Sequence, residues 1–381
     1  MKIVYILKSM APIGGLERVM CDKMNYLVEH GYDVSLITYE QGRHPLVFNI
    51  DGRVRCIDID VRFFRLYNLS IIKRVFYTFC YRIMFRKRLQ CVISELSPDV
   101  IITTTYSMPV VDIIASLSTK AKKILESHVA FFIMRKTHAY RKNFILGFLA
   151  KMYDNHMGRS VSKFECLVSL TRGDANDWLS LTSKVVVIPN PVTLYPEADS
   201  IHSGDLHRII CVGRLSEQKG FDMLIDAFSL IKNQCDDWHI DIFGSGEEEI
   251  KLKRRIIEKG LHNQIIIHAP ISTVYDEYKK SDFLVLSSRY EGFGLVLTEA
   301  SACGLPIVSF RCKYGPEDII KHGFNGLLVE NGNIYDMAEK ILWMIKHKKE
   351  RLEMGINARD IAANYRKDII MQQWIKLFES L

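Results

Sequence analysis

The fold is decided first by residues 2–39, which read KIVYILKSMAPIGGLERVMCDKMNYLVEHGYDVSLITY. Residues 2–7 are a short apolar run rich in β-branched side chains, and such a run predicts a buried strand. Residues 16–29 repeat apolar side chains at helical spacing and stop at Gly31, a residue type that commonly ends helices. Residues 33–39 predict the next strand. A strand, a helix and a second strand in so short a span indicate the opening of a parallel, doubly wound α/β sheet.

The alternation of strands and helices continues and then restarts after a linker. In the first half, further strands are predicted at residues 100–104, 123–126, 166–169 and 185–188. The segment TLYPEADSIHSGDL, residues 193–206, is polar and rich in turn-forming residues, which is typical of a linker. Beyond it, strands are predicted at residues 208–212, 238–243, 264–268, 283–286, 306–310 and 326–329. The second half therefore predicts another parallel sheet.

The sequence thus predicts an α/β protein of two tandem Rossmann-like, doubly wound domains that face each other across a cleft. The first domain is expected to span residues 1–192 and the second residues 193–365. A C-terminal helix at about residues 366–381 is expected to pack back on the first domain. Ligands of such sheets bind at the carboxyl ends of the strands, so the cleft is the expected binding site.

Composition and charge exclude several classes of protein. The chain has 381 residues, of which 48% are hydrophobic and 25% charged, and these values exclude a disordered, collagenous or disulfide-scaffold chain. The net charge is +7, but residues 1–190 hold 27 basic and 16 acidic side chains, a net +11, which leaves −4 for the remainder. We expect the basic half and the mildly acidic half to meet different partners.

The cysteines and the apolar segments predict where the protein works. None of the nine cysteines form a C-x-x-C pair, so we expect reduced, buried thiols of a cytosolic protein. The N-terminus lacks the long apolar core and the cleavage site of a signal peptide. No stretch approaches the roughly 18 uncharged apolar residues that a membrane-spanning helix needs. A cytoplasmic location is therefore expected.

Two loops that follow predicted strands have features of anion-binding sites. The loop SMAPIGGLER carries Gly14 and Gly15 ahead of a helix whose free N–H groups can bind an anion, although a tight turn explains the glycines equally well. The loop VGRLSEQKG places Arg214 and Lys219 where a helix begins. Such a pair of cations could neutralise a diphosphate, and two solvated loop charges are the alternative interpretation.

The most specific segment is YEGFGLVLTEA, residues 290–300, directly after a predicted strand. Gly292 and Gly294 expose backbone N–H groups at the start of a helix. Glu291 precedes that helix and Glu299 lies within it, so the two carboxylates are not expected to share a ligand atom. Glu291 could bind hydroxyls near the phosphates, and Glu299 a ribose. The alternative is an exposed acid beside an ordinary helix glutamate.

Three further motifs are weaker. The loop Gly244-Ser245-Gly246 lacks a third glycine and is followed by three acids, so we interpret it as a turn whose ligand contacts are secondary. His128, in the triplet ESH, ends a predicted strand and can face the cleft, although a lone histidine is more often structural. Asp58 and Asp60 have the spacing of a metal–diphosphate site but occupy a strand-like stretch in the other half, and we interpret them as structural. No Walker A loop or zinc spacing occurs, and no metal site is expected.

Two stretches combine basic and aromatic side chains and lack acidic ones. Residues 61–90 hold eight basic side chains and residues 127–153 hold five. Such stretches suit an anionic membrane surface or a phosphorylated lipid acceptor, which is the partner that we favour. Nucleic acid is a weaker candidate that we do not expect to bind, and ordinary packing with solvated charge is the remaining alternative.

Taken together, these segments resemble the family 4 retaining glycosyltransferases, whose fold is named GT-B. The matching segments follow the family's order along nearly the whole chain and read IGGLERV, ESH, VGRLSEQKGFD, FGSGEEE and SSRYEGFGLVLTEASACGLPIVSF. The later stretches YGPEDII and HGFNGLLVE resemble the branch that builds bacterial surface polysaccharides, O-antigens and lipid-linked oligosaccharides.

The resemblance implies roles for residues of the second domain. Arg214 and Lys219 would hold the donor diphosphate, Glu291 the hydroxyls of the donor sugar and Glu299 the nucleotide ribose. The helix start would contact the donor through Gly292, Phe293, Gly294 and Leu295. The loop HAPI, which ends at Ile271, would meet the base, but it lacks the glycine that is common there. Uridine is inferred from the branch.

The resemblance also implies roles for residues of the first domain. Gly14 and Gly15 would bring backbone to the phosphates, and His128 would contact the sugar near the reacting carbon. Asn190 stands in Pro-Asn-Pro, where many members continue as Pro-Asn-Gly, so a hinge role for Asn190 does not carry over.

The sequence therefore predicts a metal-independent, retaining hexosyltransferase. Its donor would be a UDP-hexose or UDP-N-acetylhexosamine, and its acceptor a lipid-linked saccharide or oligosaccharide. It would work in the cytoplasm, at the inner face of the cytoplasmic membrane. A UDP-N-acetylglucosamine 2-epimerase or a glycogen-type synthase of the same fold is the enzymatic alternative. A basic membrane- or nucleic-acid-binding module is the non-enzymatic one.

Overall fold

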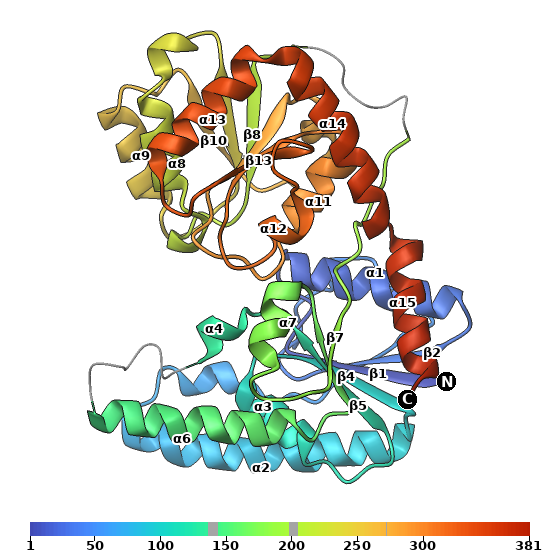
Figure 1. Ribbon diagram of the computed structural model, residues 1–381. Helices are drawn as coiled ribbons and strands as arrows, with labels where there is room; N and C mark the ends of the chain where they lie inside the picture. Colours follow the sequence, from blue (N-terminus) through green and yellow to red (C-terminus); the bar gives the residue numbers. More distant parts are fainter. Residues whose placement is uncertain (136–143, 198–204, 272) are drawn as a thin grey trace. The chain divides into compact units, whose positions relative to one another are not determined.

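The structure is a computed structural model that describes residues 1–135, 144–197, 205–271 and 273–381. The chain folds into two compact units (Figure 1). Unit 1 contains Met1–Ile188 and Met371–Leu381, and unit 2 contains Pro189–Ile370. From the sequence alone, the boundaries are placed at residues 192 and 365. Each unit is built on one parallel sheet.

The sheet of unit 1 has seven parallel strands in the order β3-β2-β1-β4-β5-β6-β7. They are β1 (Lys2–Leu7), β2 (Asp33–Thr38), β3 (Arg55–Asp58), β4 (Val100–Thr104), β5 (Lys122–Ser127), β6 (Cys166–Ser169) and β7 (Val185–Val187). The central strands are buried along nearly their whole length, because helices cover both faces of the sheet.

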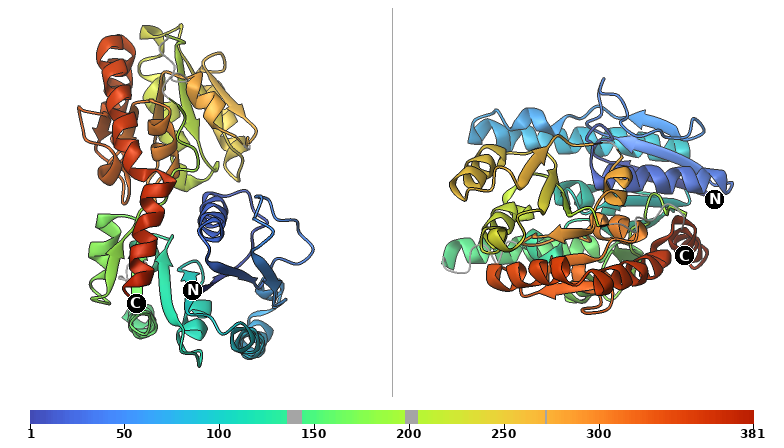
Figure 2. Two further views of the ribbon diagram at one scale, coloured as in Figure 1. Left: turned by 90° about the vertical axis from the view of Figure 1, so that its right-hand side faces the viewer. Right: turned by 90° about the horizontal axis from the view of Figure 1, so that it is seen from above.

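The helices of unit 1 divide between these two faces. They are α1 (Gly15–Glu29), α2 (Ile71–Leu96), α3 (Met108–Ala115), α4 (Phe131–Met134), α6 (Phe144–Val161), α7 (Arg172–Trp178) and the end of α15 (Lys367–Glu379). Val4 and Ile6 of β1 share a core with side chains of α2, α3, α6 and α7. Tyr5 points to the opposite face, where it meets Lys23 of α1, and Lys23 in turn contacts Trp374 of α15. The two chain termini lie close together in this unit (Figures 1 and 2).

The sheet of unit 2 has six parallel strands in the order β10-β9-β8-β11-β12-β13. They are β8 (Arg208–Val212), β9 (His239–Phe243), β10 (Ile265–His268), β11 (Phe283–Leu286), β12 (Ile307–Phe310) and β13 (Gly326–Val329). The helices of this unit are α8 (Phe221–Ser229), α9 (Glu249–Glu258), α10 (Tyr275–Lys279), α11 (Leu295–Ala302), α12 (Pro316–Ile319), α13 (Ile334–Lys346), α14 (Lys348–Ala362) and the start of α15.

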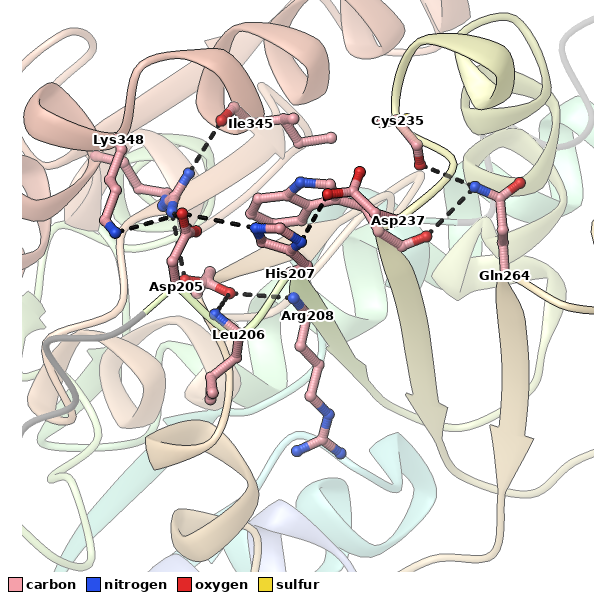
Figure 3. A network of polar contacts seen from close by, with 12 residues as sticks. Asp205, Leu206, His207, Arg208, Cys235, Asp237, Gln264, Ile345 and Lys348 are labelled. Carbon is pink, nitrogen blue, oxygen red and sulfur yellow. Dashed lines mark hydrogen bonds and ion pairs between the residues drawn. The ribbon is translucent and has the colours of Figure 1, made fainter.

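A polar network joins the start of β8 to the last helices of unit 2 (Figure 3). Arg351 of α14 is buried, and its guanidinium donates to the carboxylate of Asp205 over 2.6 Å. Asp282 accepts hydrogen bonds from the backbone N–H groups of Leu206 (2.9 Å) and Arg208 (3.0 Å). These bonds fix the segment that enters β8, and β8 leads directly into the loop that carries Arg214 and Lys219.

The structure confirms the predicted fold class, with two parallel-sheet α/β domains. The strands at residues 100–104, 166–169, 208–212, 283–286 and 326–329 have the predicted bounds. The prediction that all thiols are buried is wrong, because Cys56 and Cys91 are exposed and Cys80 is half-buried, although all nine cysteines are free. These three thiols lie on the outermost strand and on α2, where fewer neighbours cover them. Among the described residues, no helix is long and apolar enough to cross a membrane.

Candidate functional site

The loops after β8 and β11 form the most chemically distinctive cluster of unit 2. The two strands are hydrogen-bonded neighbours, so their carboxyl ends bring the two loops side by side. Lys219 in the first loop and Glu291 in the second form an ion pair, with Nζ and Oε1 2.6 Å apart. The structure therefore joins two residues that the sequence assigned to separate motifs.

Backbone contacts fix Lys219 opposite Glu291. The N–H of Arg289 donates to the carbonyl oxygen of Gln218 over 2.8 Å, and the hydroxyl of Ser287 donates to the carbonyl oxygen of Lys219 over 3.0 Å. Gly220 follows with a φ of +63°, and a Cβ there would lie 2.1 Å from the carbonyl oxygen of Ser287. Only glycine accommodates both the left-handed backbone and the close approach.

Arg289 adds a second connection between the two loops. Its guanidinium makes two hydrogen bonds to the carboxylate of Asp222, at 2.9 and 2.7 Å, and a third to the carbonyl oxygen of Glu217 at 2.7 Å. This fork geometry is the strongest form of arginine–carboxylate pairing. Arg289 lies next to the sequence motif, and nothing in its spacing distinguishes it from a solvated charge.

Glu291 is held at both its backbone and its side chain. It is 5% exposed, and the hydroxyl of Ser288 donates to Oε1 over 2.6 Å, the same oxygen that pairs with Lys219. Its N–H donates to Lys313 and its carbonyl oxygen accepts from Tyr314, both at 2.8 Å. Oε2 makes no hydrogen bond with any residue that the structure describes. One oxygen is thus fixed, and the other is available to a ligand.

Arg214 is exposed and makes no side-chain hydrogen bond or ion pair within the described part of the chain. Its loop is positioned through the backbone, because Leu215 donates to the carbonyl oxygen of Ser245 over 2.8 Å. A Cβ at Gly244 would lie 1.9 Å from the carbonyl oxygen of Gly213, and a Cβ at Gly246 would lie 2.3 Å from that of Leu215. The two glycines of this turn are therefore explained by the close packing of the two loops.

The helix start after Glu291 is shaped by glycine. Gly294 caps α11 with a φ of +87°, and the first N–H groups of the helix have no side-chain cap. Such N–H groups are suited to bind an anion. Phe293 is buried, and its ring lies 5.9 Å from that of Tyr365, so a ligand would meet its backbone rather than its ring. Leu295 begins the helix.

Glu299 lies inside α11 and apart from the Lys219–Glu291 pair. It is buried, and the hydroxyl of Tyr278 on α10 donates to its Oε2 over 3.4 Å. Burial raises the pKa of Tyr278 well above its ordinary value, and the charge of Glu299 adds to this shift, so Tyr278 remains a donor. Ile271 lies on the loop after β10 and is half-buried.

The predicted residues of unit 1 follow the carboxyl ends of β1 and β5. Gly14 caps α1 and Gly15 begins it. A Cβ at Gly14 would lie 2.3 Å from the carboxylate of Glu17, so an acid occupies the space above this helix start. His128 follows β5, and its Nε2 lies 3.0 Å from Oε2 of Glu126. These residues belong to unit 1, whereas the Lys219–Glu291 pair belongs to unit 2.

Lys23 is the residue of this region that sequence reasoning missed. Its Nζ lies 2.7 Å from Oε1 of Glu126, and the two side chains are 1% and 0% exposed. In the sequence, Lys23 resembles any lysine of an amphipathic helix, so no signal marks it as buried. Asp58 and Asp60 both pair with Arg62, at 3.0 and 2.6 Å, in agreement with their structural interpretation.

Comparison with known protein families gives two matches that follow one another along the chain. The model described as Glycosyltransferase Family 4 matches residues 13–194, and the model described as Glycosyl transferases group 1 matches residues 198–361. The chain is therefore a glycosyltransferase that carries a family 4 domain followed by a group 1 domain. The first model covers Gly14, Gly15 and His128, and the second covers the Lys219–Glu291 pair.

Among the relatives of this glycosyltransferase, two match over nearly the whole length of both chains. An uncharacterized glycosyltransferase of Haemophilus influenzae is 27% identical over 375 residues, which are 98% of each chain. The amylovoran biosynthesis glycosyltransferase AmsD of Erwinia amylovora is 26% identical over 383 residues, again 98% of each chain.

Solved structures confirm that the glycosyltransferase has the GT-B fold. A sucrose-phosphate synthase from Thermosynechococcus elongatus matches with a TM-score of 0.80 and 16% identity, covering 100% of this chain and 99% of that one. TarM of Staphylococcus aureus, solved with UDP and alpha-GlcNAc-glycerol, matches with a TM-score of 0.78 and 17% identity over 99% of this chain and 100% of that one.

Proposed function

We propose that this glycosyltransferase moves a hexose or N-acetylhexosamine from a UDP-sugar to a saccharide acceptor in the synthesis of a bacterial surface polysaccharide. The observation that carries the proposal is the Lys219–Glu291 pair at the carboxyl edge of a parallel sheet, with the unpaired Arg214 in the same loop as Lys219. The name of AmsD, an amylovoran biosynthesis enzyme, and the UDP bound by TarM support the acceptor and donor classes.

The two cations would carry the charge of the donor diphosphate. One N–H of the Lys219 ammonium points to Glu291, which leaves two donors for phosphate oxygens. Arg214 can offer its whole guanidinium fork. As the bond to the sugar breaks, negative charge builds on the diphosphate, and fixed cations together with the N–H groups of α11 stabilise it. This arrangement supplies without a metal ion what a divalent cation would otherwise provide.

The two glutamates would bind different parts of the donor. The free Oε2 of Glu291 would accept a hydrogen bond from a sugar hydroxyl, and Glu299 would accept from the ribose. Two hydrogen bonds to one oxygen of Glu291 make its carboxylate a weak nucleophile. We therefore assign retention of configuration to a front-face attack in which the leaving phosphate accepts the proton of the acceptor.

The acceptor is proposed to be lipid-linked, with unit 1 held on an anionic membrane. The first turns of α2 expose seven large apolar side chains, which are Ile71, Ile72, Val75, Phe76, Tyr77, Phe79 and Ile83. Exposed Lys73, Arg74, Arg86 and Lys87 accompany them on the same helix. α6 adds exposed Leu146, Phe148, Leu149 and Met152. An exposed apolar face with basic residues suits an anionic bilayer.

The membrane proposal covers only part of the two stretches singled out in the sequence. Phe85 of α2 is fully buried in the core of unit 1, so the second half of that helix is structural. Residues 136–143 of the second stretch lie outside the described residues.

The function is tested by measuring UDP release over a panel of nucleotide sugars, with and without a lipid-linked saccharide acceptor. We expect acceptor-dependent release from one UDP-hexose or UDP-N-acetylhexosamine and a product that retains the anomeric configuration. No release from any donor would refute the proposal. An epimerised free sugar nucleotide or a long polymer would assign the chain to a different enzyme of the same fold.

A further inference from the structure

A buried chain of polar groups lies behind His128 in unit 1. Nζ of Lys23 on α1 lies 2.7 Å from Oε1 of Glu126, and Oε2 of Glu126 lies 3.0 Å from Nε2 of His128. The His128 side chain is 6% exposed, and Lys23 and Glu126 are almost fully buried. Each oxygen of the carboxylate thus serves one donor, and the three residues form one connected unit.

The far end of this chain is closed by aromatic rings. Nζ of Lys23 lies 3.5 Å from the centre of the Trp374 ring and 5.9 Å from that of Tyr5. Trp374, on α15, is 1% exposed. A cation over an aromatic face is favourable, and more so away from water. Solvent therefore does not compete for the ammonium, which keeps its hydrogen bond to Glu126.

The geometry determines which nitrogen of His128 carries a proton. An ionised carboxylate only accepts hydrogen bonds, so Nε2 must donate to Glu126. In neutral imidazole the other nitrogen, Nδ1, then has a free lone pair. Nδ1 makes no hydrogen bond with the residues that the structure describes, and the backbone N–H of His128 is held by the hydroxyl of Thr105 at 3.2 Å.

We propose that Lys23 and Glu126 are positioning residues that hold His128 as the Nε2-protonated tautomer, so that Nδ1 accepts a hydrogen bond from a sugar hydroxyl. The proposal rests on the proposed function and on the role that the sequence resemblance implies for His128, which is a contact with the sugar. It adds a requirement on the substrate, because the sugar must have a hydroxyl group that donates a hydrogen bond to Nδ1 of His128.

Lys23 has a separate task, which is to supply the counter-charge of Glu126. Although burial alone would raise the pKa of Glu126, the charge of Lys23 and the hydrogen bond from His128 hold it below its ordinary value. The other titratable groups near this carboxylate are Tyr5 and Cys166. Burial raises the pKa of both, that of Cys166 to about 12, so neither carries charge near neutral pH. Lys23 is therefore the charged group that balances the Glu126 carboxylate.

The first test exchanges the carboxylate for an amide in Glu126→Gln. An amide offers one acceptor oxygen, whereas Lys23 and His128 present two donors. The oxygen should turn to the ammonium and the NH2 group to His128, which then must carry its proton on Nδ1. Nitrogen NMR of histidine-labelled protein, assigned with His128→Ala, should show Nε2–H in the wild type and Nδ1–H in the variant. Nδ1–H in the wild type would overturn the proposal.

The kinetic readout separates positioning from folding. Glu126→Gln should lower kcat by about 10–100-fold, because a buried hydrogen bond to substrate is lost, while the Kd for UDP stays unchanged. Glu95→Gln, an exposed glutamate of the same unit, is the matched control and should keep both values. An unchanged kcat in Glu126→Gln would contradict the positioning role.

The double variant Lys23→Met, Glu126→Gln supplies the decisive comparison. Without the ammonium, the amide oxygen is free to turn to His128, which restores the Nε2–H tautomer and part of kcat. A purely structural role predicts instead that the double variant is at least as impaired as Glu126→Gln alone, and that result would overturn the proposal. If the wild type transfers no sugar, the proposed function fails, whereas the NMR comparison still decides the tautomer.

Discussion

The proposed donor site depends on contacts between single residues of two loops. The sequence predicted Lys219 and Glu291 because each follows a buried strand in a loop with glycines. It could not predict that the two would pair, since 72 positions separate them and only the adjacency of β8 and β11 brings them together. Lys23 was missed for a related reason. Its burial under Trp374 depends on a helix at the far end of the chain.

Replacing Lys219 tests its role toward the diphosphate. Lys219→Ala should weaken UDP binding by about 10–100-fold, because charge-assisted hydrogen bonds contribute more than neutral ones. Isothermal titration calorimetry gives the Kd. Lys253→Ala is the control, since Lys253 is an exposed lysine of α9 that pairs with Glu249. Equal affinity in Lys219→Ala and wild type would exclude Lys219 from the diphosphate site.

Gly220 tests the packing of the two loops. Gly220→Ala should lower the free energy of unfolding by more than about 1–2 kcal/mol. The alanine would have to adopt a left-handed backbone conformation, and its Cβ would clash with the carbonyl oxygen of Ser287. Gly323→Ala is a matched control, since Gly323 has a φ of +78° and nothing within 4 Å of its Cβ position. Urea unfolding measures both. A similar loss in the two variants would mean that the close approach of Ser287 contributes nothing.

The elements of this protein were predicted unequally well. Strands that are buried on both faces form continuous apolar runs, so their bounds could be predicted from the sequence within a residue or two. The edge strand β3 was predicted only as a strand-like stretch, because none of its residues is buried and its apolar signal is short. In α2 the sequence showed one basic-aromatic stretch. The structure divides this helix into a first half without buried side chains and a second half that buries Phe85, Leu89 and Ile93.

The exposed half of α2 gives a prediction for membrane binding. Phe76→Ser with Phe79→Ser should weaken binding to anionic vesicles by about tenfold or more, because each exposed ring buries apolar area in the bilayer interface. Vesicle sedimentation measures the bound fraction. Ile356→Ser, which alters an equally exposed apolar side chain on α14, should leave binding unchanged. Equal binding by the Phe76/Phe79 variant would remove α2 from the membrane contact.

At the scale of the whole molecule, the net charge differs between the two units. The net +11 of residues 1–190 falls mostly on unit 1, which bears the exposed basic residues of α2. In unit 2 the two cations assigned to the donor, Arg214 and Lys219, lie in one loop at the carboxyl end of β8, and Lys219 is paired with Glu291. In the proposed function, the basic unit 1 would therefore meet the acceptor and the less basic unit 2 would bind the donor.

The proposed role of the two cations in unit 2 predicts that sugar transfer requires no divalent metal ion. Since Arg214, Lys219 and the N–H groups of α11 carry the leaving-group charge, the rate of UDP release should be the same in EDTA as in buffer with Mg²⁺. The assay compares initial rates after exhaustive chelation. Loss of activity in EDTA that Mg²⁺ restores would show that the cations of the chain are insufficient.

The central claim is that Glu291, held by Lys219 and Ser288, binds the donor sugar. Its most direct test is the rate of sugar transfer by Glu291→Ala, with circular dichroism to verify the fold and Glu330→Ala, an exposed acid of unit 2, as control. We predict that Glu291→Ala abolishes transfer while its spectrum and its UDP affinity remain, and that Glu330→Ala is fully active. Wild-type transfer by Glu291→Ala would contradict the account.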